Sequence, residues 1–146
     1  IELLPKNAII YNFPNPNSFP GYIKMGWKLV HNYGMCLLGS YNEYAQEHPV
    51  KMDKEYAQWW ISGRNLSYTK RDGHYFLLQK DRRPLCYRVL AEVDKEIAVQ
   101  YPHVVFGFFF YKSTKITWYS KHFAVSHVVS RSSDLGYIPT WKIDAV

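Results

Sequence analysis

Residues 74–90 read HYFLLQKDRRPLCYRVL. Two mainly apolar runs, 74–79 and 85–90, flank the stretch 80–84, which holds four charged residues and a proline. Apolar runs of this length, separated by a short turn-forming stretch, are typical of a β-hairpin. The segment therefore predicts two antiparallel strands near the middle of the chain.

Helices and further strands are expected on both sides of this hairpin. Asp53 can cap a helix, Glu55 falls in the first turn where the helix dipole favours a carboxylate, and Gly63 can end the helix. Two shorter helices are expected at 19–25 and 94–100. The other expected strands are 8–13, 27–30, 34–38, 104–111, 116–119 and 123–129. A few helices among many strands predict an α/β or mixed α+β domain.

Composition narrows the class of protein. The chain has 146 residues, of which 47% are hydrophobic and 18% aromatic, so a packed core is expected and intrinsic disorder is excluded. No apolar run approaches the roughly 20 residues that cross a bilayer, so no membrane partner is expected. Lys and Arg number 18 against 12 Asp and Glu, a net charge of +6 that permits but does not require contact with phosphates.

The chain begins at Ile1, without the charged start and long apolar stretch of a signal peptide, and we expect it to be part of a longer protein. Cys36 and Cys86 each lie in an apolar run. They are best interpreted as buried, reduced thiols of a cytoplasmic protein, with a disulfide between them as the open alternative.

One segment carries residues with chemical potential. Residues 15–27 read NPNSFPGYIKMGW, and they follow the strand expected at 8–13. Asn15 and Ser18 are three positions apart. Gly26 follows Tyr22 by four positions and is itself followed directly by Trp27. The prolines stop the strand, the Asn and Ser side chains can cap a helix, and Gly26 can end it in a left-handed conformation.

This spaced set resembles the second signature segment of the GNAT acyltransferase superfamily. In that segment a strand leads into a helix that carries Asn-x-x-Ala and then Tyr-x-x-x-Gly-Phe or Gly-Trp. The sequence also looks like a branch of bacterial acetyltransferases in which a module with a Trp-rich helix, here Trp59-Trp60, follows the transferase core. The resemblance implies the C-terminal half of a GNAT-like fold at 1–45, followed by a strand-rich α+β module at 46–146.

The resemblance also implies an activity, namely N-acetyl transfer from acetyl-CoA to an amine acceptor that the sequence does not identify. Tyr22 takes the position of the tyrosine that protonates the departing CoA thiolate as a general acid. Asn15 takes the position of an amide that hydrogen-bonds the pantetheine arm of the cofactor. Ser18 takes the small-residue position beside it and is the second candidate cofactor contact.

The sequence departs from the family pattern in one respect. The superfamily binds the CoA pyrophosphate with a loop of the form Gln/Arg-x-x-Gly-x-Gly/Ala, whose backbone amides grip phosphate oxygens at a helix N-terminus. No segment of these 146 residues matches that loop. We therefore expect that activity requires the missing N-terminal half of the same protein as a partner.

A different class of function stays open. The alternative is a non-catalytic module that binds nucleic acid or another ligand through a basic, aromatic hairpin. The residues that would form it are Arg82, Arg83 and Arg88 with Tyr75, Phe76 and Tyr87. Strand alternation would bury about half of those aromatic rings, which makes nucleic acid the less favoured partner.

No metal site is expected from the sequence. No two of the six histidines are at metal-ligand helical spacing, and the sequence contains no Cys-x-x-Cys motif.

Overall fold

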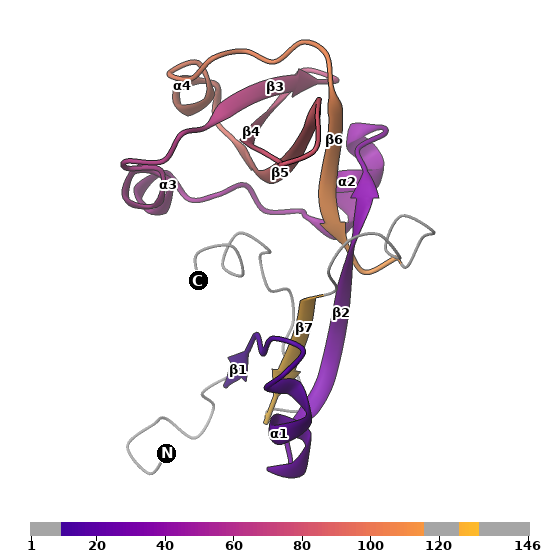
Figure 1. The fold of residues 1–146 in the computed structure, drawn as a ribbon. Helices are drawn as coiled ribbons and strands as arrows, with labels where there is room; N and C mark the ends of the chain where they lie inside the picture. Colours follow the sequence, from indigo (N-terminus) through magenta and orange to yellow (C-terminus); the bar gives the residue numbers. More distant parts are fainter. Residues whose placement is uncertain (1–9, 116–125, 132–146) are drawn as a thin grey trace.

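The computed structural model describes residues 10–115 and 126–131, and it is a mixed α+β fold. The strands are β1 (Tyr11–Asn12), β2 (Lys28–Leu37), β3 (Ser67–Arg71), β4 (His74–Lys80), β5 (Cys86–Val93), β6 (Phe108–Ser113) and β7 (Ser126–Ser130). The helices are α1 (Phe19–Lys24), α2 (Tyr41–Glu47), α3 (Lys54–Trp60) and α4 (Lys95–Ala98). Within the described residues the strands form one seven-stranded sheet in the order β1-β7-β2-β6-β5-β4-β3 (Figure 1). Neighbouring strands are antiparallel except β5 and β6, which are parallel.

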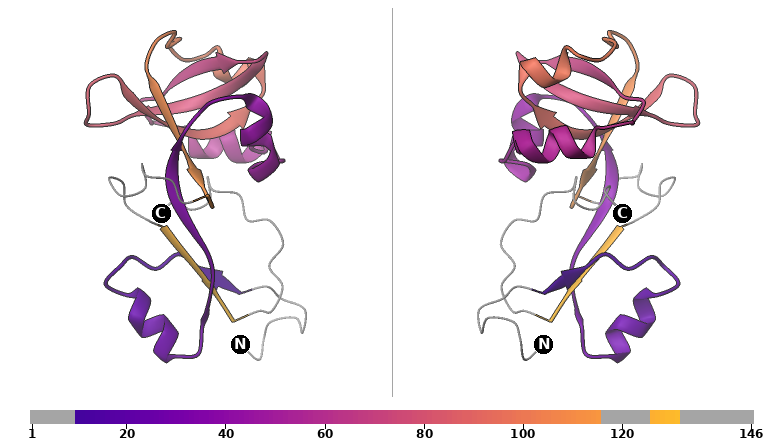
Figure 2. Two further views of the ribbon diagram at one scale, coloured as in Figure 1. Left: turned by 90° about the vertical axis from the view of Figure 1, so that its right-hand side faces the viewer. Right: turned by 90° about the vertical axis from the view of Figure 1, so that its left-hand side faces the viewer.

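The long strand β2 connects two halves of the molecule. Its first part pairs with β7, from Lys28 opposite Ser130 to Tyr33 opposite Ser126. Its second part, 34–37, pairs instead with β6. Figure 2 shows β2 running from a small lower half, with β1, α1 and β7, to a larger upper half that contains the other helices and strands.

The lower half is assembled from both ends of the described chain. β7 lies between β1 and β2 and pairs antiparallel with both. β1, α1 and β2 come from residues 1–45, whereas β7 comes from the stretch 46–146, which the family resemblance would place in a separate module. The chain leaves the lower half in the middle of β2, after Tyr33, and β7 returns to it.

The upper half is a curved sheet that is buried on both faces. The outer edge of β3 is covered by the chain after α4, since Tyr68 N donates to Pro102 O (2.9 Å) and Val104 N donates to Tyr68 O (2.8 Å). Leu77 packs with α3 and α4 on one face, while Phe76 and Leu78 pack with α2 on the other. Burial on both faces explains why 76–78 is a continuous apolar run with no polar alternation.

Several elements are confirmed close to their expected bounds. These are α1, the β4–β5 hairpin, and α3, where the Asp53 carboxylate accepts from the backbone amides of Glu55 (2.9 Å) and Tyr56 (3.1 Å). The two expected segments 27–30 and 34–38 are one continuous strand, β2. The helix expected at 94–100 is shorter, and the strand expected at 116–119 lies outside the described residues. Cys36 and Cys86 are both free and only half-buried, so no disulfide joins them.

Two elements were not expected from the sequence. Helix α2 begins after Ser40, whose hydroxyl accepts from the Glu43 amide at 3.4 Å. The Ser-x-x-Glu spacing of these two residues is a capping-box pattern that could have revealed this helix. Strand β3 pairs with β4 along its full length, and no strong apolar pattern marks it in the sequence.

The strand expected at 104–111 begins only at Phe108. A side chain at Gly107 would lie 3.0 Å from the Leu85 carbonyl oxygen and from the Tyr87 ring. The backbone approaches its neighbours closely at this position, and residues 104–107 form a loop in front of β6. No helix in the described part of the chain is long and apolar enough to span a membrane.

Helix α2 is tied to the end of β6 by two ionisable residues. His48 is 2% exposed, and its Nε2 lies 2.7 Å from the Lys112 carbonyl, which can only accept, so Nε2 carries the hydrogen. The Glu47 carboxylate accepts from Ser113 Oγ (2.7 Å) and from the backbone amide and hydroxyl of Thr114 (both 2.8 Å). Burial lowers the pKa of His48. Burial alone would raise the pKa of Glu47, but these hydrogen bonds outweigh it and hold that pKa below its ordinary value.

We expect the free energy of unfolding to fall as the pH is lowered below 6.5, the ordinary pKa of histidine. The unfolded chain then binds a proton that the buried His48 resists, so protonation favours unfolding. The contribution of the neutral His48 to the free energy of unfolding is fully present above pH 6.5. It is lost as the pH falls toward the lowered pKa of His48 in the folded chain, with a slope of at most about 1.4 kcal/mol per pH unit. Because the pKa of Glu47 is also lowered in the folded chain, its protonation adds a further loss of stability below pH 4.5, the ordinary pKa of that carboxyl.

Urea unfolding at a series of pH values measures this effect. His48→Gln keeps a hydrogen-bond donor but does not titrate, so it should flatten the profile just below pH 6.5. His103→Gln changes an exposed histidine and serves as the matched control, which should keep the wild-type profile. Identical profiles for His48→Gln and wild type would contradict the assignment.

Candidate functional site

The C-terminal cap of α1 is formed by Tyr22, Gly26 and Trp27. Gly26 has a φ of +86°, the left-handed conformation that glycine adopts at least cost. Trp27 N donates to Tyr22 O and Gly26 N donates to Ile23 O, both at 3.1 Å. These are the two hydrogen bonds of a Schellman motif, and the Tyr22 and Trp27 rings supply its usual apolar contact at 5.1 Å, edge to face. The spacing Tyr-x-x-x-Gly-Trp thus has a structural explanation that involves the tyrosine ring but not its hydroxyl.

The Tyr22 hydroxyl has a separate partner at the end of β1. Asn12 Nδ2 donates to the Tyr22 oxygen. The orientation of the Asn12 amide follows from its other contact, because the backbone amide of Phe13 donates to Asn12 Oδ1 at 2.8 Å. Asn12 was not among the residues singled out in the sequence, since its role depends on β1 lying beside α1. The Asn12 nitrogen is the donor and the Tyr22 oxygen the acceptor, so the phenolic hydrogen of Tyr22 stays available to donate.

The two candidate cofactor contacts, Asn15 and Ser18, lie together in the turn before α1. Asn15 Oδ1 accepts from the amides of Asn17 (3.0 Å) and Ser18 (2.9 Å), and Ser18 Oγ donates to Asn15 O at 3.3 Å. Both residues are exposed. The Asn15 oxygen is therefore used within the turn, and its Nδ2 is the atom that can donate to a ligand.

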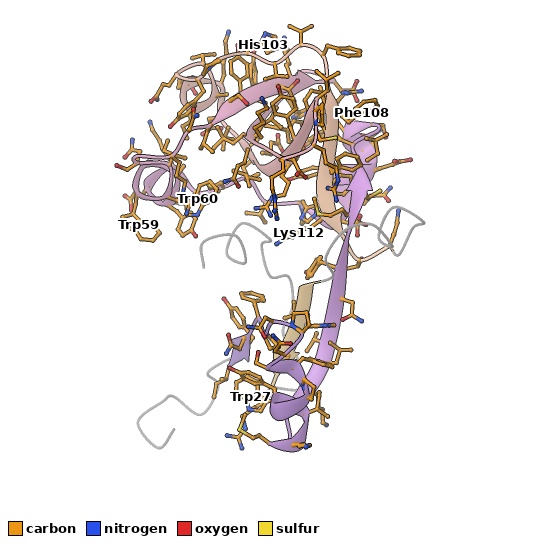
Figure 3. All side chains as sticks on the ribbon, viewed as in Figure 1. Trp27, Trp59, Trp60, His103, Phe108 and Lys112 are labelled. Carbon is orange, nitrogen blue, oxygen red and sulfur yellow. The ribbon has the colours of Figure 1, made fainter. Side chains whose placement is uncertain are left out.

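The residues of the alternative hairpin site are divided between core and surface. Phe76 is fully buried, Tyr87 packs against the Phe109 ring at 5.9 Å, and Lys70 lies over the Tyr75 ring at 5.6 Å. Arg82 and Arg83 are exposed at the hairpin turn, where Arg83 pairs with Asp81 at 3.3 Å. In the Trp-rich helix α3, Trp60 is buried under the Arg64 guanidinium, whereas Trp59 points away from the sheet (Figure 3).

A second polar group, which the sequence did not reveal, lies between α2 and the hairpin. Glu92 is 3% exposed. Its carboxylate lies 2.8 Å from His74 Nδ1 and accepts from the Tyr41 hydroxyl at 3.0 Å, and Lys51 Nζ lies 3.9 Å away. The Tyr41 and His74 rings are stacked in parallel. Burial, followed by the hydrogen bond to Glu92, raises the pKa of Tyr41. We call these four residues the Glu92 cluster; they fasten the start of α2 to the sheet.

A cleft of about 630 Å³ opens between α3 and α4. Its lining includes two cations, Lys54 and Arg64, with Glu96 as the carboxylate and amides from Gln58 and Gln100. The cleft is thus mainly polar, and none of the sequence-predicted site residues lines it.

Within residues 10–115 and 126–131, no group of three His, Cys, Asp or Glu side chains is arranged to hold a metal ion. Searches with protein-family models, curated proteins and solved structures found no match to this chain.

Proposed function

We propose that this chain forms part of an N-acetyltransferase that moves an acetyl group from acetyl-CoA to an amine, with Tyr22 as the general acid. The observation that carries the proposal is the hydrogen bond from Asn12 Nδ2 to the Tyr22 oxygen. It holds the half-buried phenol in place and leaves the phenolic hydrogen available to donate. The resemblance of residues 15–27 to a signature segment of the acyltransferases supplies the reaction class.

The proposed step is direct transfer. The amine nitrogen attacks the thioester carbonyl, the new C–N bond forms, and the C–S bond of acetyl-CoA breaks. The sulfur leaves as a thiolate and takes the proton of the Tyr22 hydroxyl. The proton lost by the amine then passes through water to the tyrosinate and restores the hydroxyl. A donor on the phenol oxygen, here Asn12 Nδ2, stabilises the negative charge that develops there as the proton leaves.

The exposed turn before α1 fits a modest role in holding the substrate. Asn15 can offer only its Nδ2 hydrogens, so it would bind a carbonyl oxygen of the pantetheine arm as a donor. Ser18 Oγ donates within the turn and can still accept one hydrogen bond from an amide of the same arm. Neither residue carries charge, so the phosphates of CoA would need other groups.

Tyr22→Phe is expected to lower the rate of CoA release about a hundredfold, the lower range for removal of a general acid. The affinity for acetyl-CoA should stay unchanged, because the ring and its contact with Trp27 remain. Calorimetric titration with acetyl-CoA measures the affinity, and the appearance of free thiol measures the rate, for this chain and for one extended upstream of Ile1. Asn12→Ala is the companion variant and should give a smaller loss of rate. Absence of heat with both chains would contradict the proposal, as would an unchanged rate for Tyr22→Phe.

A further inference from the structure

The upper end of the molecule exposes four apolar side chains on two neighbouring segments. Val105 and Phe106 are 82% and 73% exposed in the loop before β6, and Phe108, the first residue of β6, is 50% exposed. Leu85, just before β5, is 48% exposed. We call these four residues the apolar tip. Exposed apolar residues that gather on adjacent segments mark an interaction surface, whereas isolated ones are ordinary.

The two segments of the apolar tip are held together by the backbone. Phe108 N donates to Leu85 O at 2.7 Å, and the parallel strands β5 and β6 start side by side, with Cys86 opposite Phe108. Gly107 packs so closely against Leu85 and Tyr87 that a β-carbon there would lie 3.0 Å from both. The neighbouring Phe109 is only 4% exposed, so the chain is anchored in the core directly behind the tip.

The β4–β5 turn beside the apolar tip is cationic. The β4–β5 turn that ends at Leu85 carries Lys80, Arg82 and Arg83, and its one carboxylate, Asp81, pairs with Arg83 at 3.3 Å. The loop 104–107, which carries Val105 and Phe106, contains no charged residue of either sign. A partner that covers the tip therefore meets apolar side chains in the middle and positive charge beside them.

We propose that the apolar tip and the adjacent basic turn form a contact surface for an anionic lipid bilayer. Apolar side chains that enter the interface and Arg or Lys side chains that meet lipid phosphates are the two contributions that hold a peripheral protein on such a membrane. The absence of a spanning apolar run in the sequence does not bear on this mode, because the protein lies on the membrane and does not cross it.

Two other occupants fit less well. Single-stranded nucleic acid would use the positive charge, but Val105 and Leu85, half of the tip, are aliphatic and have no ring on which a base can stack. A second copy of this chain docked on the same face would bring a second basic turn to the contact, and it would add like charge that opposes association.

The tip lies at the end of the molecule remote from the candidate acyltransferase residues. Figure 3 shows Phe108 in the upper half and Trp27, which packs on Tyr22, in the lower half. Contact with a membrane at the tip would leave the region of Tyr22 exposed to solvent, so the proposal stands or falls independently of the acetyl-transfer proposal.

Co-sedimentation of the whole chain with lipid vesicles tests the proposal. We expect binding to phosphatidylcholine vesicles that contain phosphatidylserine, weaker binding to phosphatidylcholine alone, and a loss of affinity as salt is raised. Phe106→Asp should weaken binding about tenfold or more, because an aromatic side chain no longer leaves water. Arg82→Ala should weaken it about fivefold, the effect of one basic residue at the surface of an anionic leaflet.

Trp59→Asp is the matched control, since Trp59 is 70% exposed on α3, away from the tip, and its replacement should leave vesicle binding unchanged. Circular dichroism should show the same thermal unfolding for Phe106→Asp and wild type, because the side chain is exposed.

A folded wild-type chain that does not sediment with the anionic vesicles overturns the proposal. The same holds if Trp59→Asp loses as much vesicle affinity as Phe106→Asp. Binding to an oligothymidylate that is lost in Phe106→Asp, without vesicle binding, assigns the surface to nucleic acid instead. Tyr22→Phe should bind vesicles like wild type.

Discussion

Replacement of Phe76 by alanine is expected to lower the free energy of unfolding by about 3–5 kcal/mol. Phe76 is fully buried in the middle of β4. Its ring meets the Tyr44 ring edge to face at 5.0 Å and the Tyr41 ring at 6.3 Å, so it joins the sheet to α2. Truncation removes the apolar burial of the ring and leaves a cavity that the sheet and helix cannot fill without moving.

Urea unfolding of wild type and Phe76→Ala measures the difference. Phe106→Ala removes the same atoms from a side chain that is 73% exposed and should change stability by no more than about 0.5 kcal/mol. A loss of less than 1 kcal/mol for Phe76→Ala, on the order of a typical surface change, would mean that α2 does not pack on this face of the sheet.

Glu92→Ala is expected to cost about 2–3 kcal/mol of stability. The variant removes a buried carboxylate that accepts from Tyr41 and bonds to His74, and both partners then lose a charge-assisted hydrogen bond. Lys51 and His74 are partly exposed and can turn to water, which keeps the cost below that of a fully buried ion pair.

A double-mutant cycle separates the contribution of the tyrosine. Tyr41→Phe removes only the hydroxyl, and the double variant should be less destabilised than the sum of the two single variants by about 0.5–1.5 kcal/mol. Glu96→Ala, an exposed carboxylate on α4, is the control and should lie within about 0.5 kcal/mol of wild type. Full additivity of Tyr41→Phe and Glu92→Ala would contradict the hydrogen bond between them.

Local signals in the sequence were sufficient for the elements that depend on local hydrogen bonds. Asp53 caps α3 with its own side chain, and Gly26 ends α1 in the left-handed conformation, as their residue types predict. The Lys80–Pro84 stretch likewise marks the hairpin between β4 and β5. In each case the residues that decide the structure lie within a few positions of one another.

The pairing of distant strands left no comparable signal. The apolar run at 8–13 predicted the strand that contains β1, but nothing in that run indicated β7 as its partner. Strand β3 is separated from β4 by Asp72 and Gly73 alone, both with positive φ, and this Asp-Gly turn is a local hairpin signal that could have revealed β3. The acetyltransferase interpretation rested on Tyr22, Asn15 and Ser18, and it stays a prediction. The contact that gives the Tyr22 hydroxyl a partner involves Asn12, which tertiary structure alone brings there.

The Glu92 cluster was hidden for a more specific reason. The β4–β5 register shifts by one residue between Leu77 and Leu78, where Leu90 is the extra residue on β5. The shift places Glu92 opposite Phe76, on the same face as His74. A regular hairpin counted from the turn would instead put the Glu92 side chain on the other face. Turn position alone therefore could not bring the carboxylate and the imidazole together.

The strand order of the lower half has a kinetic consequence. Ser130 Oγ bonds to Ile10 O across 120 positions of the chain, and β1 pairs with no described strand but β7. The hairpins of the upper half close short loops and can form early, whereas the β1–β7 contact must first overcome the entropy of a very long loop. On the ribosome, β1 and α1 emerge long before their neighbour is synthesised. The β1–β7 pairing is therefore expected to form after the hairpins of the upper half, whereas α1 and its cap can form from local contacts.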